Sequence, residues 1–360
     1  MIKKIAVLRA NALGDYIFVL PALQALRETF PDAEIVLLGR KWHKEYLAER
    51  PGPVDRVVVV PLYGGISEVE GYVADESVLN EFFDTMQREK FDLAFQLHGG
   101  GRNSNPFLLR LGAKKTIGLK TPDAASLDIN IPYVYFFNET MRYLEVVGRA
   151  GAKTQNIQPR LSVTASDIEE AKSVVDNPEG KPVAVIHPGA SDITRRWPGN
   201  NFAMIADHLI ERGYHVCITG LAWEREIIDA VVSNMIYKDQ VDDLSAKLSL
   251  GGTTGLLSFS EIVISNDTGP LHVARALGVP SIGIFWCANI INAAPMTTSL
   301  NRNLLSWTLN CPLCGLSTFK FKETESSCKH HTSMVAEVTV DEVKYAINEV
   351  LEVAMVVKHH

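Results

Sequence analysis

The segment from Asp267 to His272 combines residue types that bind phosphate groups. It follows an apolar run at residues 262–264, typical of a buried strand, and it precedes a helix-like segment. A small-residue turn between a strand and a helix directs backbone N–H groups and the positive end of the helix dipole toward one point. Such a point binds anions, so Asp267, Thr268, Gly269 and His272 are candidate ligand-binding residues. The alternatives are a helix cap at Asp267 and a core histidine at His272.

Two other expected strand ends carry polar groups. Gly189, Ser191 and Arg195 lie in the loop after residues 183–186, where glycine permits close approach of a ligand and arginine supplies a cation. Glu224 follows residues 215–219 and could accept hydrogen bonds from ribose hydroxyls. The alternatives are a solvated basic loop around Arg195 and an acidic first helical turn at Glu224.

Asp15 lies where the first expected strand passes into a helix, and α/β proteins often place reactive carboxylates there. The alternative is that Asp15 caps its helix. The spacing G-x-G-x-x-G is absent from this turn, which argues against a dinucleotide-binding site.

A cysteine-rich segment offers a candidate metal site. Cys311 and Cys314 have zinc-type spacing, and Cys328 and His330 follow. Because the second pair is spaced more loosely than in a zinc finger or ribbon, a surface loop with a few thiols is the preferred interpretation. The preferred expectation is therefore no metal, and a metal site at these four residues stays open as the alternative.

The composition indicates a soluble globular protein of two domains. The chain has 360 residues, 46% of them hydrophobic and 21% charged. A net charge of −7 argues against a nucleic-acid partner. The apolar N-terminal segment is too short for a signal peptide, and the sparse, odd set of five cysteines points to a reducing cytoplasm. Residues 276–301 are uncharged, but they contain Pro280, Gly283 and Pro295, which would break a membrane-spanning helix, so we expect a buried strand and a loop there.

Short β-branched runs alternate with amphipathic segments, which predicts an α/β fold. The expected strands are residues 5–8, 34–38, 56–60, 93–96, 115–118, 183–186, 215–219, 262–264 and 281–285. We predict an N-terminal domain at 1–160, a linker region at 161–181 with a helix near 167–175, and a C-terminal domain at 182–340. A final helix at 341–357 is expected to pack back on the first domain. Two doubly wound domains would face each other across a cleft, with ligands at the carboxyl ends of the strands.

Together these residues resemble glycosyltransferase family 9, which includes the lipopolysaccharide heptosyltransferases. The resemblance spans nearly the full length. It is carried by the segments 13–23, 30–35 and 96–99, and most specifically by His187 to Pro198 and Asn266 to Ala274.

The resemblance implies a GT-B fold with two Rossmann-like domains and an inverting, metal-independent transfer from a nucleoside-diphosphate sugar, ADP-heptose in the best-known members. Asp15 matches the catalytic base, and Glu224 matches a carboxylate near the donor ribose. Arg195 stands where many members have a phosphate-binding lysine, and Thr268, Gly269 and His272 match the diphosphate-binding turn.

The implied partners are a nucleotide-sugar donor and a glycan or glycolipid acceptor, such as lipopolysaccharide, in cell-envelope assembly. No cofactor is implied. The implied location is the cytoplasm, where lipid-linked acceptors would bring the enzyme to the inner face of the membrane. Two alternatives stay open: a sugar-nucleotide epimerase or hydrolase on the same fold, and a non-catalytic sugar-nucleotide-binding protein.

Overall fold

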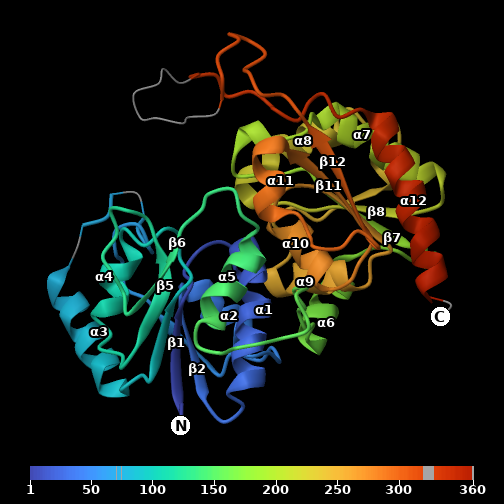
Figure 1. Ribbon diagram of the computed structural model, residues 1–360. Coiled ribbons are helices and arrows are strands. Elements are labelled where there is room, and N and C mark those ends of the chain that lie inside the picture. Colours follow the sequence, from blue (N-terminus) through green and yellow to red (C-terminus); the bar gives the residue numbers. More distant parts are fainter. Residues whose placement is uncertain (70, 74, 319–327, 359–360) are drawn as a thin grey trace. The chain divides into compact units, whose positions relative to one another are not determined.

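The chain folds into two compact units, Met1–Ser162 and Val163–His360 (Figure 1). The computed structural model describes residues 1–69, 71–73, 75–318 and 328–358. In both units strands and helices alternate, as the sequence pattern predicts.

The N-terminal unit begins with a strand whose apolar residues are all buried. Its strands are β1 (Lys4–Leu8), β2 (Glu34–Gly39), β3 (Arg56–Val59), β4 (Leu93–Gln96), β5 (Thr116–Lys120) and β6 (Ile129–Pro132). Its helices are α1 (Leu13–Thr29), α2 (Lys41–Leu47), α3 (Glu76–Glu89), α4 (Ser104–Leu109) and α5 (Glu139–Gly148). Continuous apolar runs such as that of β1 are typical of parallel strands covered on both faces.

The C-terminal unit repeats this pattern. Its strands are β7 (Val183–His187), β8 (His215–Ile218), β9 (Val241–Asp243), β10 (Ile262–Asn266), β11 (Ser281–Trp286) and β12 (Asn301–Ser306). Its helices are α6 (Ala165–Val174), α7 (Gly199–Glu211), α8 (Arg225–Val232), α9 (Leu250–Ser258), α10 (Gly269–Ala276), α11 (Cys287–Ala293) and α12 (Val340–Lys358).

The described strands form one parallel six-stranded sheet in each unit. The orders are β3-β2-β1-β4-β5-β6 and β12-β11-β10-β7-β8-β9. Counted from the start of each unit, both sheets have the order 3-2-1-4-5-6 of a doubly wound Rossmann-like fold. The predicted α/β, GT-B fold class is therefore confirmed. The strand order reverses between β1 and β4 and between β7 and β10, and ligands bind at such switch points.

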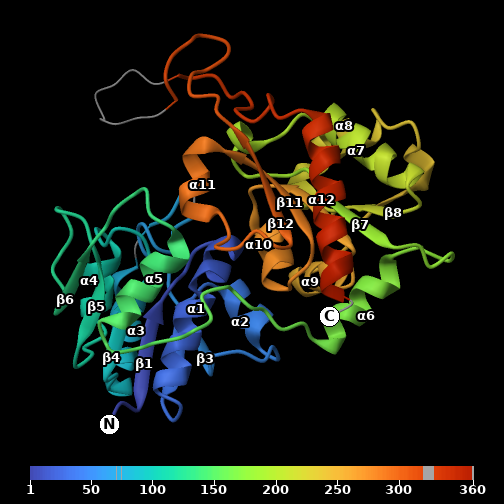
Figure 2. The same cartoon turned by 45° about the vertical axis from the view of Figure 1, so that its right-hand side comes forward.

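The C-terminal helix differs from its expected packing. Val343, Ile347 and Val350 recur at helical spacing and belong to the same buried cluster as Ile282 and Ile284 of β11. In Figure 2, α12 lies alongside β12, and its contacts are with α7, β11 and β12. The helix thus buries its apolar face on the C-terminal unit, to which it belongs, rather than on the N-terminal one.

Residues 163–181 of the expected linker region also belong to the C-terminal unit. Its helix α6 packs against α9 so closely that Gly255 of α9 is needed, because a Cβ there would lie 2.0 Å from the carbonyl oxygen of Asp167. The uncharged segment 276–301 contains β11 and α11. Within the described residues, no helix has the length and apolar character needed to cross a membrane.

Candidate active site

The loops at the carboxyl ends of β7, β8, β10 and β11 form one connected polar cluster in the C-terminal unit. All eight predicted ligand-binding residues lie in these loops or in the first turn of the helix that follows. The switch point between β7 and β10 lies at the centre of this edge of the sheet.

Asp267 is the centre of the cluster and is 3% exposed. Its Oδ1 pairs with Nε2 of His272 at 3.1 Å, and its Oδ2 accepts a hydrogen bond from Nδ2 of Asn289 at 3.0 Å. Burial alone would raise the pKa of Asp267, but the bonds from His272 and Asn289 and the nearby Arg195 lower it. Asp267 is therefore an ionised group that positions the donors around it.

Arg195 reaches this carboxylate from the loop after β7. Its Nη1 lies 3.6 Å from Oδ2 of Asp267 and donates to the Asp267 carbonyl at 3.3 Å, while Nη2 donates to Oγ of Ser191 at 3.3 Å. The buried Nε of Arg195 has no hydrogen-bond partner. A guanidinium held this way retains donor capacity for an anion.

The N-terminus of α10 supplies further donors. Thr268 is its N-cap in extended conformation, yet no side chain caps the helix. The hydroxyl of Thr268 pairs instead with Oγ of Ser265 at 3.1 Å. With Gly269 at the first helical position, the uncapped N–H groups and the helix dipole form an anion site of the expected kind.

Glu224 lies against the backbone of Gly189. A Cβ on Gly189 would lie 2.0 Å from Oε1 of Glu224, so only glycine fits. Glu224 is 2% exposed, and burial raises its pKa although the backbone N–H of Leu221 donates to Oε2 at 2.8 Å. A buried carboxylate at a strand end is suited to accept hydrogen bonds from a ligand hydroxyl.

Asn266 links these loops, a role that the sequence interpretation did not assign. Its Oδ1 accepts from the backbone N–H of Trp197 at 3.0 Å, and its Nδ2 donates to the carbonyl of Pro188 at 2.8 Å. Trp197 itself is buried, and its Nε1 donates to the carbonyl of Val338 at 2.8 Å, so it is a core residue. Asn289 was also missed. Its position three residues after β11, at the same sheet edge, could have indicated it.

Asp15 lies in the N-terminal unit, in the first turn of α1. Its Oδ2 accepts from the backbone N–H of Ala12 at 3.1 Å, so it does cap the helix. Its Oδ1 accepts from Nη2 of Arg9 at 2.8 Å. Arg9 is itself buried, with its guanidinium 4.7 Å from the centre of the Tyr143 ring. The carboxylate is thus oriented by Arg9 while its side chain stays 35% exposed.

His98, after β4, lies at the switch point of the N-terminal sheet. Its Nδ1 accepts from the backbone N–H of Ala10 at 3.2 Å, so Nε2 carries the proton and donates to the carbonyl of Gly65 at 3.2 Å. Burial, assisted by Arg9, lowers the pKa of His98 to about 4. The sequence interpretation placed this segment in the family resemblance and in an expected acceptor-binding loop, but it assigned no individual role to Arg9 or His98.

The structure also brings together the four candidate metal ligands Cys311, Cys314, Cys328 and His330. One ligand atom of each lies within 4.8 Å of the others.

Known proteins resemble this chain along most of its length. Residues 80–315 match the sequence model of glycosyltransferase family 9 (heptosyltransferase). Lipooligosaccharide heptosyltransferase 2 of Haemophilus ducreyi is 22% identical over 97% of this chain and 99% of its own length. Two solved structures share the fold: the family 9 glycosyl transferase of Veillonella parvula (TM-score 0.78, 20% identity, 97% of each chain) and the ADP-heptose lps heptosyltransferase II of E. coli (TM-score 0.75, 18% identity, 97% of this chain and 98% of that one).

Proposed function

We propose that this chain, which belongs to glycosyltransferase family 9 and is a glycosyltransferase, transfers a heptose-like sugar. The donor would be a nucleoside-diphosphate sugar and the acceptor a lipopolysaccharide-type molecule. The observation that carries the proposal is the Arg195–Asp267–His272 cluster at the uncapped N-terminus of α10. It combines a cation, a helix dipole and unused N–H donors, which is what a diphosphate requires.

In this proposal the C-terminal unit binds the donor. Arg195 and the N–H groups near Gly269 stabilise the charge that grows on the diphosphate as it leaves. Glu224 accepts hydrogen bonds from the ribose, and Gly189 and Ser191 line the diphosphate. Asp267 keeps Arg195 and His272 in place. Because these groups supply positive charge, and because the sequence has no Asp-x-Asp motif, we propose that the transfer step needs no metal and no cofactor.

Asp15 would act as the general base in the N-terminal unit. A sugar hydroxyl is a weak nucleophile, so a carboxylate must accept its proton while the new bond forms. Displacement by the hydroxyl in one step inverts the configuration at the anomeric carbon. The acceptor would be a cell-envelope glycan or glycolipid, met in the cytoplasm at the inner face of the membrane.

The test is to incubate the purified protein with ADP-heptose and a truncated lipopolysaccharide, and to detect the product by mass spectrometry. We expect one added heptose, inverted anomeric configuration by NMR, and no acceleration by added Mg²⁺ or Mn²⁺. Equal consumption of the donor without acceptor would instead indicate a hydrolase or epimerase. Tight donor binding with no product from any acceptor would indicate a binding protein.

A further inference from the structure

The loop after β12 contains a turn that directs a backbone N–H group at the sulfur of a cysteine. The backbone N–H of Leu313 donates to Sγ of Cys311 at 3.4 Å, and that of Gly315 donates to the Cys311 carbonyl at 2.8 Å. Gly315 has φ +71°, which glycine adopts without strain, and this closes the turn just after Cys314. A backbone N–H that donates to the sulfur, as that of Leu313 does, stabilises the thiolate form of a cysteine.

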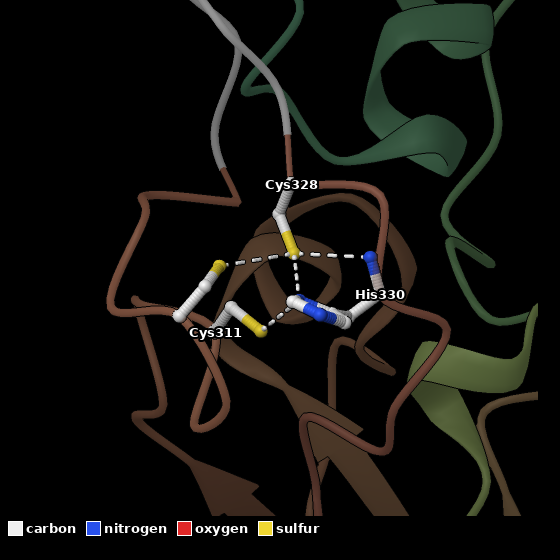
Figure 3. Close-up of side chains that lie close together, drawn as sticks. Cys311, Cys328 and His330 are labelled. Carbon is white, nitrogen blue, oxygen red and sulfur yellow. Dashed lines mark hydrogen bonds between the residues drawn. The ribbon is translucent and has the colours of Figure 1, made fainter.

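A second segment brings two more ligand atoms to the same place. In Figure 3, the side chains of Cys311, Cys328 and His330 point toward one another. Nδ1 of His330 lies 3.4 Å from Sγ of Cys328 and 3.7 Å from Sγ of Cys311. The backbone N–H of His330 also donates to Sγ of Cys328 at 3.2 Å, as in the first turn. The sulfurs of Cys314 and Cys328 are 3.5 Å apart.

These separations match the edges of a metal coordination tetrahedron. With metal–sulfur and metal–nitrogen bonds of about 2.3 and about 2.05 Å, neighbouring ligand atoms lie about 3.8 Å (S–S) or about 3.6 Å (S–N) apart. The three separations above are within a few tenths of an ångström of those values. All five cysteines are free, and 3.5 Å is far longer than a disulfide bond of about 2.05 Å.

We propose that Cys311, Cys314, Cys328 and His330 bind one tetrahedral transition-metal ion of the thiolate-preferring class, zinc or ferrous iron. Four protein ligands fill the coordination shell, which is typical of a structural site rather than a catalytic one. The proposal is independent of the reaction proposed above, in which no metal takes part.

The ion would fix the segments on either side of it. Before it, Trp286 Nε1 at the end of β11 donates to the carbonyl of Thr308 at 2.8 Å. After it, the backbone N–H of Met334 donates to the carbonyl of Thr194 at 2.7 Å, next to Arg195. Because the proposed ligand His330 lies four residues before Met334, a metal ion bound to His330 would support the loop that carries Arg195.

The test begins with the metal content of the full-length protein, measured by inductively coupled plasma mass spectrometry after purification without a metal-affinity step. We expect about one zinc or iron per chain, the spectrum itself identifying which. Cys314→Ser and Cys328→Ser should each lose the metal and lower the unfolding temperature. Cys287→Ser, which alters a cysteine outside the cluster, should retain it.

Cobalt substitution gives a second measurement that does not depend on the variants folding. Protein stripped of metal and given Co²⁺ should show thiolate-to-cobalt charge transfer and the intense visible bands of tetrahedral cobalt. A wild-type protein without bound metal, without the cobalt spectrum, or with a disulfide within the cluster would overturn the proposal. Full metal content in the Cys314→Ser, Cys328→Ser double variant would overturn it as well.

Discussion

At the scale of single residues, Asp15 combines a structural contact with a chemical one. Its Oδ2 caps α1, and its Oδ1 pairs with Arg9. An asparagine would keep one acceptor for the Ala12 N–H but could not accept a proton. We expect Asp15→Asn to lower kcat by roughly 10²- to 10⁴-fold, the usual contribution of a general base, without changing donor affinity.

A matched control separates the base from the cap. Asp167 occupies the same position in α6 and accepts from the backbone N–H of Thr164 at 2.9 Å. Asp167→Asn should leave kcat near the wild-type value. Steady-state kinetics and donor titration of both variants check this. Wild-type turnover by Asp15→Asn would exclude Asp15 as the base.

Arg195 contributes charge and directional hydrogen bonds, so its loss should weaken donor binding. Hydrogen bonds to charged groups are worth about 1.5–3 kcal/mol, which corresponds to a roughly 10- to 100-fold rise in the dissociation constant for Arg195→Ala. The dissociation constant of Arg195→Lys should lie between those of the wild type and Arg195→Ala, because lysine keeps the charge but not the paired N–H donors of the guanidinium.

Isothermal titration with ADP-heptose measures these affinities. Arg212→Ala is a suitable control, because Arg212 follows the C-terminus of α7 and contacts Asn348 rather than the cluster around Asp267. If Arg195→Ala bound the donor as tightly as Arg212→Ala, the diphosphate would have to bind elsewhere.

At the scale of elements, the loops after β7 and β8 fit together through Gly189 and Glu224. An added methyl group on Gly189 would overlap the Glu224 carboxylate, whereas on Gly199 its nearest neighbours would be at 3.5 Å, an ordinary contact. We expect Gly189→Ala to lower the free energy of unfolding by about 1–3 kcal/mol, as overpacking does, and to weaken donor binding. Gly199→Ala should do neither.

A double-mutant cycle measured by urea unfolding tests that contact directly. Because Glu224→Ala removes the overlapping carboxylate, the penalty of Gly189→Ala should shrink in the double variant. Strictly additive penalties would show that the two residues do not meet.

The central elements were predictable from sequence because both faces of their sheets are buried. Expected strands at 93–96 and 34–38 match the buried central strands β4 and β2 to within a residue. β6, β9 and β12 were missed, and all three are edge strands. Polar residues such as Asp242, Asp243 and Asn303 occur in them, so the apolar signal is weak. Strand-end rules located Asp15, Arg195, Glu224 and the Asp267 segment, but not the partners that orient them, since contacts of Arg9 and Asn289 depend on tertiary packing.

At the scale of the whole molecule, buried histidines make the fold sensitive to acid. Burial lowers the pKa of His98 and of His187 to about 4, and that of His43 to about 3. The unfolded chain protonates these rings near their ordinary pKa of 6.5. Between the two values the unfolded state binds more protons, so the stability present above pH 6.5 is lost as the pH falls through the folded pKa.

His187 offers the sharpest test of this linkage. Its Nδ1 pairs with Oγ1 of Thr219 at 3.2 Å in the core of the C-terminal unit. A shift of this size corresponds to roughly 3 kcal/mol. We expect His187→Asn, which cannot titrate, to lose stability less steeply than wild type between pH about 7 and about 4.5 in urea unfolding followed by circular dichroism. Glu224 opposes the trend, since its raised pKa favours the folded state at low pH, so Glu224→Gln should steepen the loss. Parallel pH profiles for wild type and His187→Asn would mean that the pKa of His187 is the same in the folded and unfolded states.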